Sequence, residues 1–296
     1  MIDCSVIFIG INCKNNFEKC IKNFRKGNPV KELIYVDSSD DDTADVAKQY
    51  FDKVVVTRRI GVGTARNAGL DVATGKYICY VGIDNIMEDN SIANMIAYLL
   101  EKDCTAVSLK TLIYTPKDYL GKALNIYRNK FTEGYKDALG TPILYRAEIL
   151  KKYRFKNMVY NDDGDLFDRM IKDGNKFAIS KEICYEFSTT SWKETITRWR
   201  RYGLGDCEFY YHNLSHAGIP RKLRSFMHPF MTDIIKVFFA NNIFKFLYAL
   251  PFLSLVTVNR YIGWAKAAKT VKEMIANHHS LDMGEREKTV KKLLSH

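Results

Sequence analysis

The sequence lacks the signatures of several protein classes. Its seven cysteines are an odd number without a CxxC pair, and most lie in apolar runs such as YICYVG. This pattern argues against a disulfide framework or a zinc site, and it favours reduced, buried thiols in a cytosolic compartment. The amino-terminal MIDCSVIFIG has no basic region and no cleavage site, so we expect no signal peptide. The sequence also has no internal repeats and no low-complexity runs.

No apolar run is long enough for a clear membrane span. The strongest run, IFKFLYALPFLSLVTV at 243–258, is shorter than the ~20 residues a span needs and contains Lys245 and Pro251. With FMHPFMTDIIKVFFANN at 226–242, it could form a pair of helices that lie in a membrane interface. The alternative is a buried helical cap over the sheet. We favour peripheral membrane contact, and the alternative stays open.

Composition bounds the kind of partner. The length of 296 residues allows one large domain or two small ones with a buried core, and the hydrophobic fraction of 47% is that of a globular chain. The formal net charge of +11 indicates an anionic partner: nucleotide phosphates, nucleic acid or an acidic membrane face. Charge alone does not choose among these.

The first third of the chain alternates short β-branched or aromatic runs with helical stretches. We expect strands at SVIFIGI, ELIYVD, KVVVT and KYICYVG, with helices between them at 14–25, DDTADVAKQYF and 63–72. This order predicts a mostly parallel sheet with helices on both faces and ligands at the carboxyl ends of the strands. Those ends carry Gly10–Asn12, Asp37 and Gly82–Asp84, so three polar clusters should meet at one crevice.

The remaining two thirds change character twice. From about 105 to 190 the chain mixes strands, at TAVSLKTLIY, GTPILY and KFAIS, with helices, and it holds the acidic cluster YNDDGDLFDRMIKDG. The last hundred residues are expected to be helical throughout. There Trp192, Trp199 and Tyr202 fall at helical spacing among basic side chains, an arrangement that could hold an acceptor by stacking on a sugar or pairing with a lipid phosphate.

Each polar cluster taken singly has a structural explanation. Asp37 opens SSDDDT, which could be a helix N-cap region, Asp84 could belong to a turn, and Arg66 could pair with a surface carboxylate. Their joint order is harder to explain in that way. An Asp follows one strand, a glycine-rich turn precedes Arg66, another Asp follows the next strand, and an Asp-Asp pair comes later before a helix.

Five stretches in this order resemble the inverting family 2 glycosyltransferases of the GT-A fold. They are SVIFIGINCKNNFEKCIKNF, ELIYVDSSDDDT, GVGTARNAGLDVATGKYICYVGIDN, NDDGDLFDRMIKDG and TITRW, and together they cover roughly residues 4–205. The resemblance implies a Rossmann-like α/β nucleotide-diphospho-sugar transferase fold with a C-terminal helical extension. It divides the chain into a nucleotide-sugar-binding half at 1–115, an acceptor-binding half at 116–190 and the extension at 191–296, which is the part expected to contact a membrane.

The resemblance assigns the donor site by position. The opening strand ends where the family holds the base and ribose, Asp37 occupies the acidic position that contacts the base, and Arg66 matches the arginine of the ARN stretch near the nucleotide. GID stands where the family has its DXD motif, with Asp84 as the metal-binding residue and Gly82 in place of the first Asp. The residues expected to contact the donor are Gly10, Ile11, Asn12, Asp37, Arg66, Asn67, Gly82 and Ile83.

The same resemblance assigns the acceptor side. NDDGDL aligns with the family's ED pair, which makes Asp163 the expected catalytic base and Asp162 its neighbour; a slip of one residue would exchange them. TITRW matches the QxxRW motif at Arg198 and Trp199, the expected acceptor-binding residues, with Thr195 in place of Gln. This partial match favours a simple transferase over a processive synthase.

The expected function is a metal-dependent, inverting glycosyl transfer. A leaving diphosphate requires a divalent cation, Mn²⁺ or Mg²⁺, held by carboxylate oxygen. The expected donor is a UDP- or GDP-sugar, and the expected acceptor is a lipid-linked saccharide on the cytoplasmic face of the cell membrane, in glycan or polysaccharide assembly. No nucleic-acid partner is expected. The alternatives are a catalytically impaired family member that binds sugar nucleotides, a nucleotidyltransferase, and a non-catalytic protein that binds membranes or nucleic acid.

Overall fold

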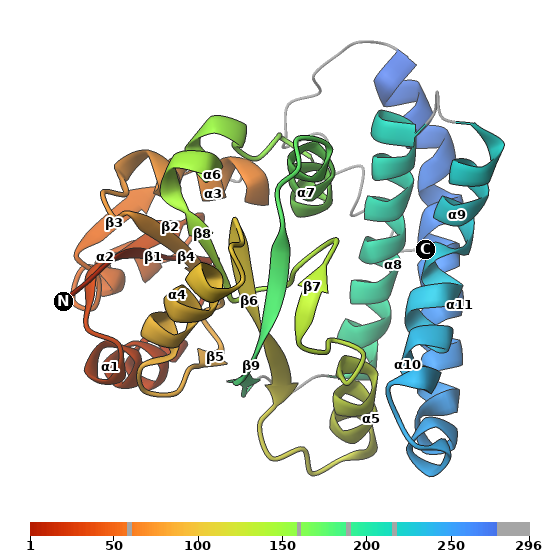
Figure 1. The fold of residues 1–296 in the computed structure, drawn as a ribbon, viewed down its shortest axis with the longest axis horizontal. Helices are drawn as coiled ribbons and strands as arrows, with labels where there is room; N and C mark the ends of the chain where they lie inside the picture. Colours follow the sequence, from red (N-terminus) through yellow and green to blue (C-terminus); the bar gives the residue numbers. More distant parts are fainter. Residues whose placement is uncertain (58–60, 159–160, 188–190, 215–217, 277–296) are drawn as a thin grey trace. The chain divides into compact units, whose positions relative to one another are not determined.

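The computed structural model describes residues 1–57, 61–158, 161–187, 191–214 and 218–276. Contacts divide the chain into two compact units (Figure 1). Unit 1 comprises Met1–Tyr114, Phe131–Asn157 and Leu166–Ser188, and unit 2 comprises Thr115–Lys130, Met158–Asp165 and Thr189–His296. Strands from both predicted halves belong to the sheet of unit 1. The three-part division expected from the sequence stays a prediction.

Unit 1 is built on a sheet of nine strands. Its order is β3-β2-β1-β4-β8-β6-β9-β5, and β7 pairs with β9 outside this path. The strands are β1 (Ile2–Gly10), β2 (Val30–Asp37), β3 (Lys53–Val56), β4 (Tyr77–Val81), β5 (Asn85–Ile86), β6 (Ala106–Ile113), β7 (Gly134–Lys136), β8 (Ile143–Arg146) and β9 (Phe177–Glu186). The pairs among β3, β2, β1 and β4 are parallel, as is β6 with β9, while β8 is antiparallel to both β4 and β6.

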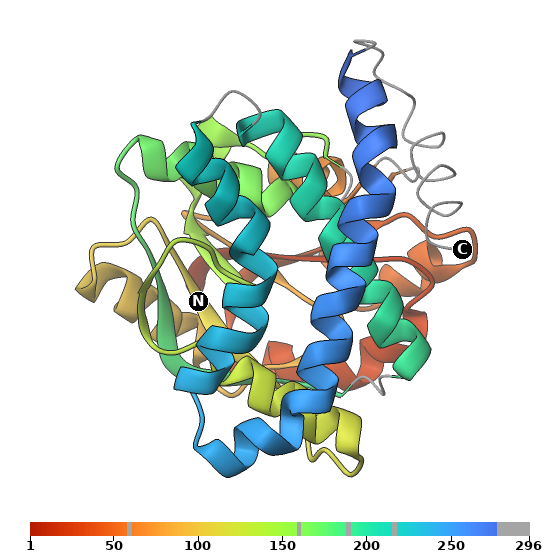
Figure 2. The ribbon, with the colours of Figure 1, turned by 90° about the vertical axis from the view of Figure 1, so that its right-hand side faces the viewer.

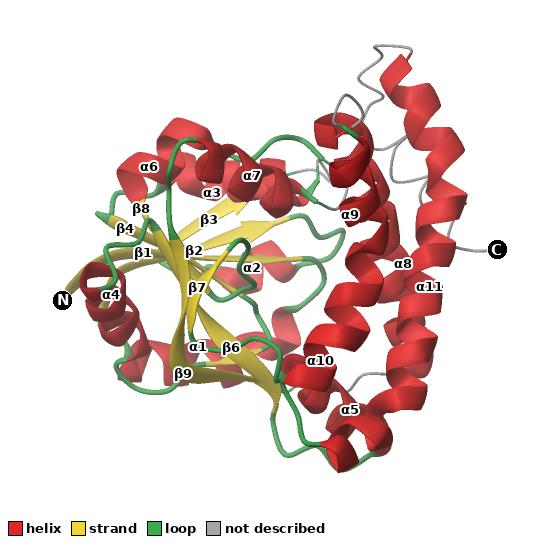
Figure 3. Cartoon of the chain, turned by 45° about the vertical axis from the view of Figure 1, so that its right-hand side comes forward, coloured by secondary structure: helices red, strands yellow, loops and turns green. Residues whose placement is uncertain are grey.

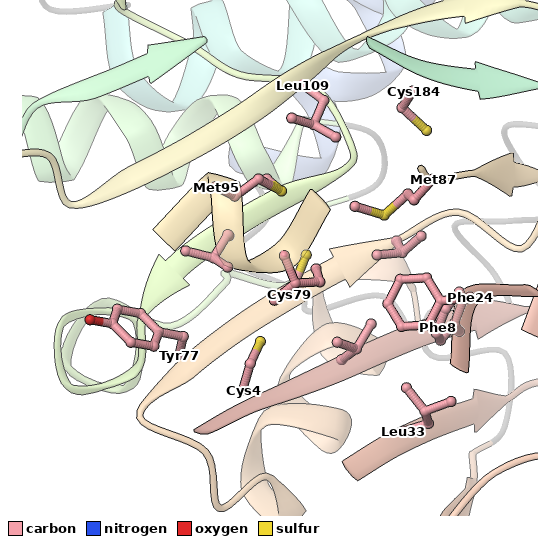
Figure 4. Packing of buried hydrophobic residues seen from close by; sticks show 14 of the residues in the cluster. Cys4, Phe8, Phe24, Leu33, Tyr77, Cys79, Met87, Met95, Leu109 and Cys184 are labelled. Atoms are coloured by element: carbon pink, nitrogen blue, oxygen red, sulfur yellow. The ribbon is translucent and has the colours of Figure 1, made fainter. Parts of the chain in front are cut away.

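Helices cover both faces of this sheet, as the alternating pattern predicts (Figure 3). Along β1, Val6 and Phe8 point into the hydrophobic cluster beneath α1 and α4, and Ile7 points into the cluster beneath α3 and α6. Figure 4 shows the first cluster, where Phe8 lies close to Phe24 of α1. The helices of unit 1 are α1 (Phe17–Gly27), preceded by a 3-10 turn η1 (Lys14–Asn16), α2 (Thr43–Ala47), α3 (Val62–Val72), α4 (Ser91–Glu101) and α6 (Ala147–Tyr153); α7 (Asp162–Lys172) begins in unit 2 and continues into unit 1.

The elements predicted for the first third all form. The side chains of β1, β2 and β4 alternate between the two clusters, so both faces of these strands are covered and their sequences are apolar almost throughout. α3 lies close against the sheet at Gly69, where an added Cβ would come within 2.7 Å of Ile7 and 2.9 Å of Val36. The seven cysteines are free thiols, and all except Cys13 are buried, as the sequence predicts.

Unit 2 is helical in its described residues, as predicted for the last hundred residues. It contains α5 (Tyr119–Arg128), α8 (Trp192–Phe209), the π-helical turn η2 (Tyr210–Leu214), α9 (Ile219–Phe230), a second π-helical turn η3 (Met231–Ile235), α10 (Lys236–Phe239) and α11 (Ile243–Ala276). Figure 2 shows the line of α9 and α10 beside α11. α8 begins with a capping box, in which Ser191 Oγ accepts from the Glu194 backbone N–H and the Glu194 carboxylate accepts from the Ser191 N–H.

A buried ionic cluster joins the helices of unit 2. Arg260 of α11 donates to Asp206 of α8 at 2.5 and 2.8 Å and to Asp233 of η3 at 3.2 and 3.3 Å. Lys130 Nζ lies 3.3 Å from Asp233, and the Tyr127 hydroxyl donates to the same carboxylate at 3.1 Å. Burial lowers the pKa of Lys130 to about 7, against the attraction of Asp233. Arg260 and the protonated form of Lys130 together balance the charges of the two carboxylates.

α11 is longer than the apolar run from which it was predicted. Its segment Ile243–Ala268 is long and apolar enough to cross a membrane by length and composition, and 44% of its most apolar window is buried. The sequence predicts that the apolar run is too short to span a membrane. This prediction is wrong for the helix, because the helix continues past the run. The same helix carries the buried Arg260, so one side of it packs within unit 2.

Candidate active site

The carboxyl ends of β1 and β2 are joined by a small set of backbone and side-chain bonds. Gly10 at the end of β1 is in register with Asp37 at the end of β2, and the Ser38 N–H donates to the Gly10 carbonyl at 3.2 Å. The loop that follows β1 is bound to the loop that follows β2, since the Asn12 N–H donates to Ser39 Oγ at 2.8 Å. Two of the three predicted clusters thus form one edge, as the parallel order requires. Ile11 lies between them and is exposed.

Asp37 is buried at this edge and held by its own loop. Its carboxylate accepts from the Ser39 hydroxyl at 2.7 Å and from the Ser39 N–H at 3.1 Å. Close by, Cys13 Sγ and the Tyr35 hydroxyl lie 3.0 Å apart. A Cβ at position 10 would come within 2.3 Å of Cys13 Sγ and 2.7 Å of the Tyr35 hydroxyl. Glycine is therefore required where the chain turns away from β1.

The third cluster follows β4, the other neighbour of β1. Phe8 of β1 is in register with Val81, so Gly82 begins the loop at the same edge of the sheet. Asn85 closes this loop: its side chain accepts from the Gly82 N–H at 2.8 Å, and its backbone N–H donates to the Gly82 carbonyl at 3.0 Å. The Cys20 thiol of α1 donates to the Ile83 carbonyl at 2.8 Å. Asp84 is thereby presented, half-buried, by a loop fixed on both sides.

Arg66 and Asn67 lie in the first turns of α3 and have different surroundings. The Arg66 guanidinium carbon lies 5.1 Å from the centre of the Phe155 ring, and its carbonyl accepts from the Tyr80 hydroxyl at 3.0 Å. Both polar atoms of the Asn67 side chain bond the backbone of Phe155, at 2.8 and 3.1 Å. In this structure Asn67 braces the chain after α6. The donor contact predicted for Asn67 stays a prediction. Arg66 carries the positive charge, and its side chain is half-buried.

The predicted base lies at the start of α7, among the residues of unit 2. Asp162 is buried, with 2% of its surface exposed, while Asp163 is half-buried and its carboxylate accepts from the Gly164 N–H at 2.9 Å. The preceding loop is bound to α8, because the Asn161 amide donates to the Gly205 carbonyl at 3.2 Å. The greater exposure of Asp163 favours it over Asp162 as the residue that reaches a substrate.

The expected acceptor residues lie on α8. Trp199 is 2% exposed, and its ring packs against Tyr127 and Phe252 with centroids 5.5 and 5.7 Å apart. A ring packed in this way has no free face for a sugar, so its packing argues against direct stacking by Trp199. Trp192 is 43% exposed and has an open surface. Arg198 is half-buried, and its acceptor contact stays a prediction.

The donor edge fits a divalent cation that arrives with its nucleotide. Within the described residues, no three His, Cys, Asp or Glu side chains gather as a metal site of their own. Gly82 supplies no ligand, which leaves Asp84 as the carboxylate of this loop. Mg²⁺-type sites commonly use one or two carboxylates, with substrate phosphates and water as the other ligands. Asp84 therefore fits a cation shared with a diphosphate, and not one that the protein binds alone.

Comparison with solved structures defines the class of fold. The chain aligns with TarS 1–349 of S. aureus, solved with UDP-GlcNAc, at a TM-score of 0.55 and 15% identity over 92% of each chain. It aligns with the mannosyltransferase PcManGT of Pyrobaculum calidifontis, solved with GDP-Man and Mn²⁺, at a TM-score of 0.58 and 17% identity over 99% of this chain and 81% of that one. The fold is that of the GT-A glycosyltransferases, as the resemblance implies.

The family follows from the sequence comparison. A model described as glycosyl transferase family 2 matches residues 5–171, more than half of the chain, and the chain belongs to that family. The glycosyltransferase YibD of Escherichia coli is 28% identical over 106 residues, which are 33% of this chain and 31% of that protein. TuaG of Bacillus subtilis, named as a teichuronic acid biosynthesis glycosyltransferase, is 27% identical over 126 residues, or 38% and 50%. The alignments thus span about a third and half of these relatives.

Several residues that hold this site in place are not among the site residues that the sequence motifs predict. Asn85 closes the loop of Asp84, and Ser39 holds both Asp37 and Asn12. Both are short polar residues within four positions of a strand end, in turns where such side chains bond the backbone. That position is the signal that could have identified them. The hydrogen bond from the Cys20 thiol to the Ile83 carbonyl could not be predicted in this way, because Cys20 belongs to a helix that is distant in sequence.

Proposed function

We propose that this protein transfers a sugar from a UDP- or GDP-sugar to an acceptor hydroxyl with inversion, in glycan or polysaccharide assembly. One observation carries the proposal. The register of β2, β1 and β4 sets Asp37, Gly10 and the loop of Asp84 along one edge of the sheet. Membership of glycosyl transferase family 2 supports the same reaction class. TarS and PcManGT, which share the fold, were solved with UDP-GlcNAc and GDP-Man.

The donor edge would divide the nucleotide into two parts. The buried Asp37 carboxylate, beside Gly10 and Asn12, would contact the base and ribose. Arg66 and a Mn²⁺ or Mg²⁺ ion held by Asp84 would meet the diphosphate. Such an ion supplies positive charge where the leaving group gains negative charge.

Asp163 would act as the general base. In the proposed step the acceptor hydroxyl gives its proton to the Asp163 carboxylate as its oxygen bonds the anomeric carbon. The bond from that carbon to the diphosphate oxygen breaks, and the nucleoside diphosphate leaves. Inversion follows when base and leaving group lie on opposite sides of the sugar.

The proposed acceptor is a lipid-linked saccharide, and the proposed site of action is the inner face of the cell membrane. Support comes from the apolar and basic sequence at 226–258. A simple acceptor of this kind suits a chain whose QxxRW motif is only partly retained, at Arg198 and Trp199.

Product analysis tests the proposal. The purified protein is incubated with UDP- and GDP-sugars, Mn²⁺ and an acceptor extract, and the nucleotide products are separated by chromatography. We expect a nucleoside diphosphate together with a glycosylated acceptor. Release of pyrophosphate would instead identify a nucleotidyltransferase. Tight donor binding without any turnover would identify an impaired family member, the alternative that Gly82 in the DXD position suggests.

A further inference from the structure

The outward side of α11 carries an apolar stripe. Phe244, Leu247, Leu255 and Val258 recur at helical spacing and are 80%, 53%, 37% and 55% exposed. They do not lie on the side of the helix that faces α8, which is marked by Gly263. A helix of a water-soluble domain normally presents polar residues to solvent. A continuous exposed apolar stripe therefore indicates a surface that another body covers.

Neighbouring elements of unit 2 also carry exposed apolar side chains. Phe239, at the end of α10, is 81% exposed just before the turn into α11. On α9, Phe226 is 54% exposed, and its ring lies 5.5 Å from Tyr261 of α11, whose hydroxyl donates to the Phe226 carbonyl at 2.9 Å. Figure 2 shows these helices side by side. The apolar face is defined here as Phe226, Phe239, Phe244, Leu247, Leu255 and Val258.

The charges of this region have one sign. Between residues 209 and 272 the sequence contains nine Lys and Arg against a single acidic residue, Asp233. Asp233 is fully buried on Arg260, so it contributes no negative charge to the surface. Lys236 and Lys245, beside the apolar face, are exposed. Exposed aromatic rings on a segment whose exposed charges are cations complement an anionic lipid bilayer.

From these observations we infer that the apolar face docks on the surface of an anionic bilayer. The phenyl rings of Phe239 and Phe244 enter the boundary between headgroups and acyl chains, and Lys236 and Lys245 meet the headgroup phosphates. α11 lies along the membrane and does not cross it, because Arg260 and the inner side of the helix are bound within unit 2. The inference deepens the proposed function, on which it rests for a lipid-linked acceptor.

Flotation of the full chain with vesicles tests this inference. We expect co-flotation with phosphatidylglycerol-containing vesicles at low salt, weak flotation with pure phosphatidylcholine, and release at high salt. The double variant Phe239→Ser/Phe244→Ser should bind at least about tenfold more weakly, since burying one such ring is worth more than that. Lys236→Gln and Lys245→Gln should each cost about fivefold. The matched control is Leu100→Ser/Tyr135→Ser, which removes two side chains of unit 1 that are 53% and 58% exposed.

Three outcomes would overturn the inference. The first is failure of the wild type to float at low salt, the result expected if a second copy covers the face; sedimentation would then show a dimer that dissociates in the Phe239→Ser/Phe244→Ser variant. The second is flotation of the double variant as strong as that of the wild type. Resistance to alkaline carbonate extraction would identify a spanning helix. Nucleoside diphosphate binding without vesicles is measured on the same preparations, so that loss of membrane docking and failure of the donor site are separated.

Discussion

At the scale of single residues, Glu32 shows how a buried charge is stabilised near the amino end of β2, away from the donor edge. Its carboxylate is buried on β2 and lies 2.7 Å from Lys53 Nζ, and it accepts from the Ser5 hydroxyl at 2.6 Å and the Thr74 N–H at 2.7 Å. Burial alone would raise the pKa of Glu32, but these partners outweigh it and lower the pKa to about 2. The residue ties three strands and the loop after α3 together.

This network predicts a specific pH dependence of stability. A carboxyl whose pKa is lowered on folding stabilises fully above its unfolded value of about 4.3, and this stability is lost as pH falls toward about 2. Glu32→Gln should lower the free energy of unfolding at neutral pH by about 1–3 kcal/mol and should flatten its decline over that acidic range. Urea unfolding at several pH values measures both. Glu101→Gln, on a carboxylate that is 65% exposed, is the control and should change neither.

Residue identities were predictable where a motif and a strand end coincide. Asp37, Gly82 and Asp84 follow strands whose apolar runs are evident in the sequence, so their common edge could be foreseen. Asn67 shows the limit of prediction from motifs. The ARN motif assigns it to the nucleotide site together with Arg66, but the motif does not predict what its side chain contacts within the protein. In the structure its side chain bonds Phe155, 88 residues away. Pairings at such separation depend on tertiary packing, which local pattern does not encode.

At the scale of elements, the contact of α8 with α11 depends on two glycines that face the opposite helix. A Cβ at Gly203 would come within 1.8 Å of the Arg260 carbonyl oxygen, and a Cβ at Gly263 within 2.0 Å of the Arg200 carbonyl oxygen. Backbone atoms cannot yield as a flexible side chain can. The two helices therefore approach this closely only because neither position has a side chain, and the approach brings Arg260 to Asp206.

The sign of one substitution tests this packing. Gly→Ala within an exposed helix normally stabilises by about 1 kcal/mol. Gly203→Ala should instead destabilise unit 2 by about 1–3 kcal/mol or more, because the methyl group forces the helices apart. Thermal unfolding followed by circular dichroism measures the change, with Ser254→Ala on exposed α11 surface as the control. A variant with raised thermal stability would contradict the close approach.

Whether a segment forms a helix or a strand was predictable wherever the pattern of apolar residues extends over many positions. The strands of the first third read as near-continuous apolar runs because both faces are covered, and the C-terminal segments read as helices by spacing. The sequence predicts helix throughout this region, but the apolar run at 243–258 alone does not show that one helix extends from Ile243 to Ala276. Beyond that run the helix continues through Arg260, whose partners Asp206 and Asp233 come from other elements. A sequence pattern does not show such partners.

At the scale of the whole molecule, the residues predicted to bind the donor and the predicted base belong to different compact units. Asp37, Arg66 and Asp84 belong to unit 1, whereas Asp162 and Asp163 belong to unit 2. Asp163→Asn should therefore leave donor binding and folding nearly unchanged, yet lower turnover by about a hundredfold or more, the scale of a lost general base. Single-turnover sugar transfer beside calorimetric donor binding measures the two effects. Asp162→Asn serves as the comparison, and parental rates in both variants would place the base elsewhere.

The most direct test of the account is the metal dependence of nucleotide binding. A nucleoside diphosphate is titrated into the protein by calorimetry, with and without Mn²⁺, for the wild type and for Asp84→Asn, which keeps the shape of the side chain and removes its charge. We expect the wild type to bind more tightly with Mn²⁺ than without it, and the variant to lose that difference while remaining folded. Binding by Asp84→Asn with unchanged Mn²⁺ dependence would contradict the assignment of the donor site.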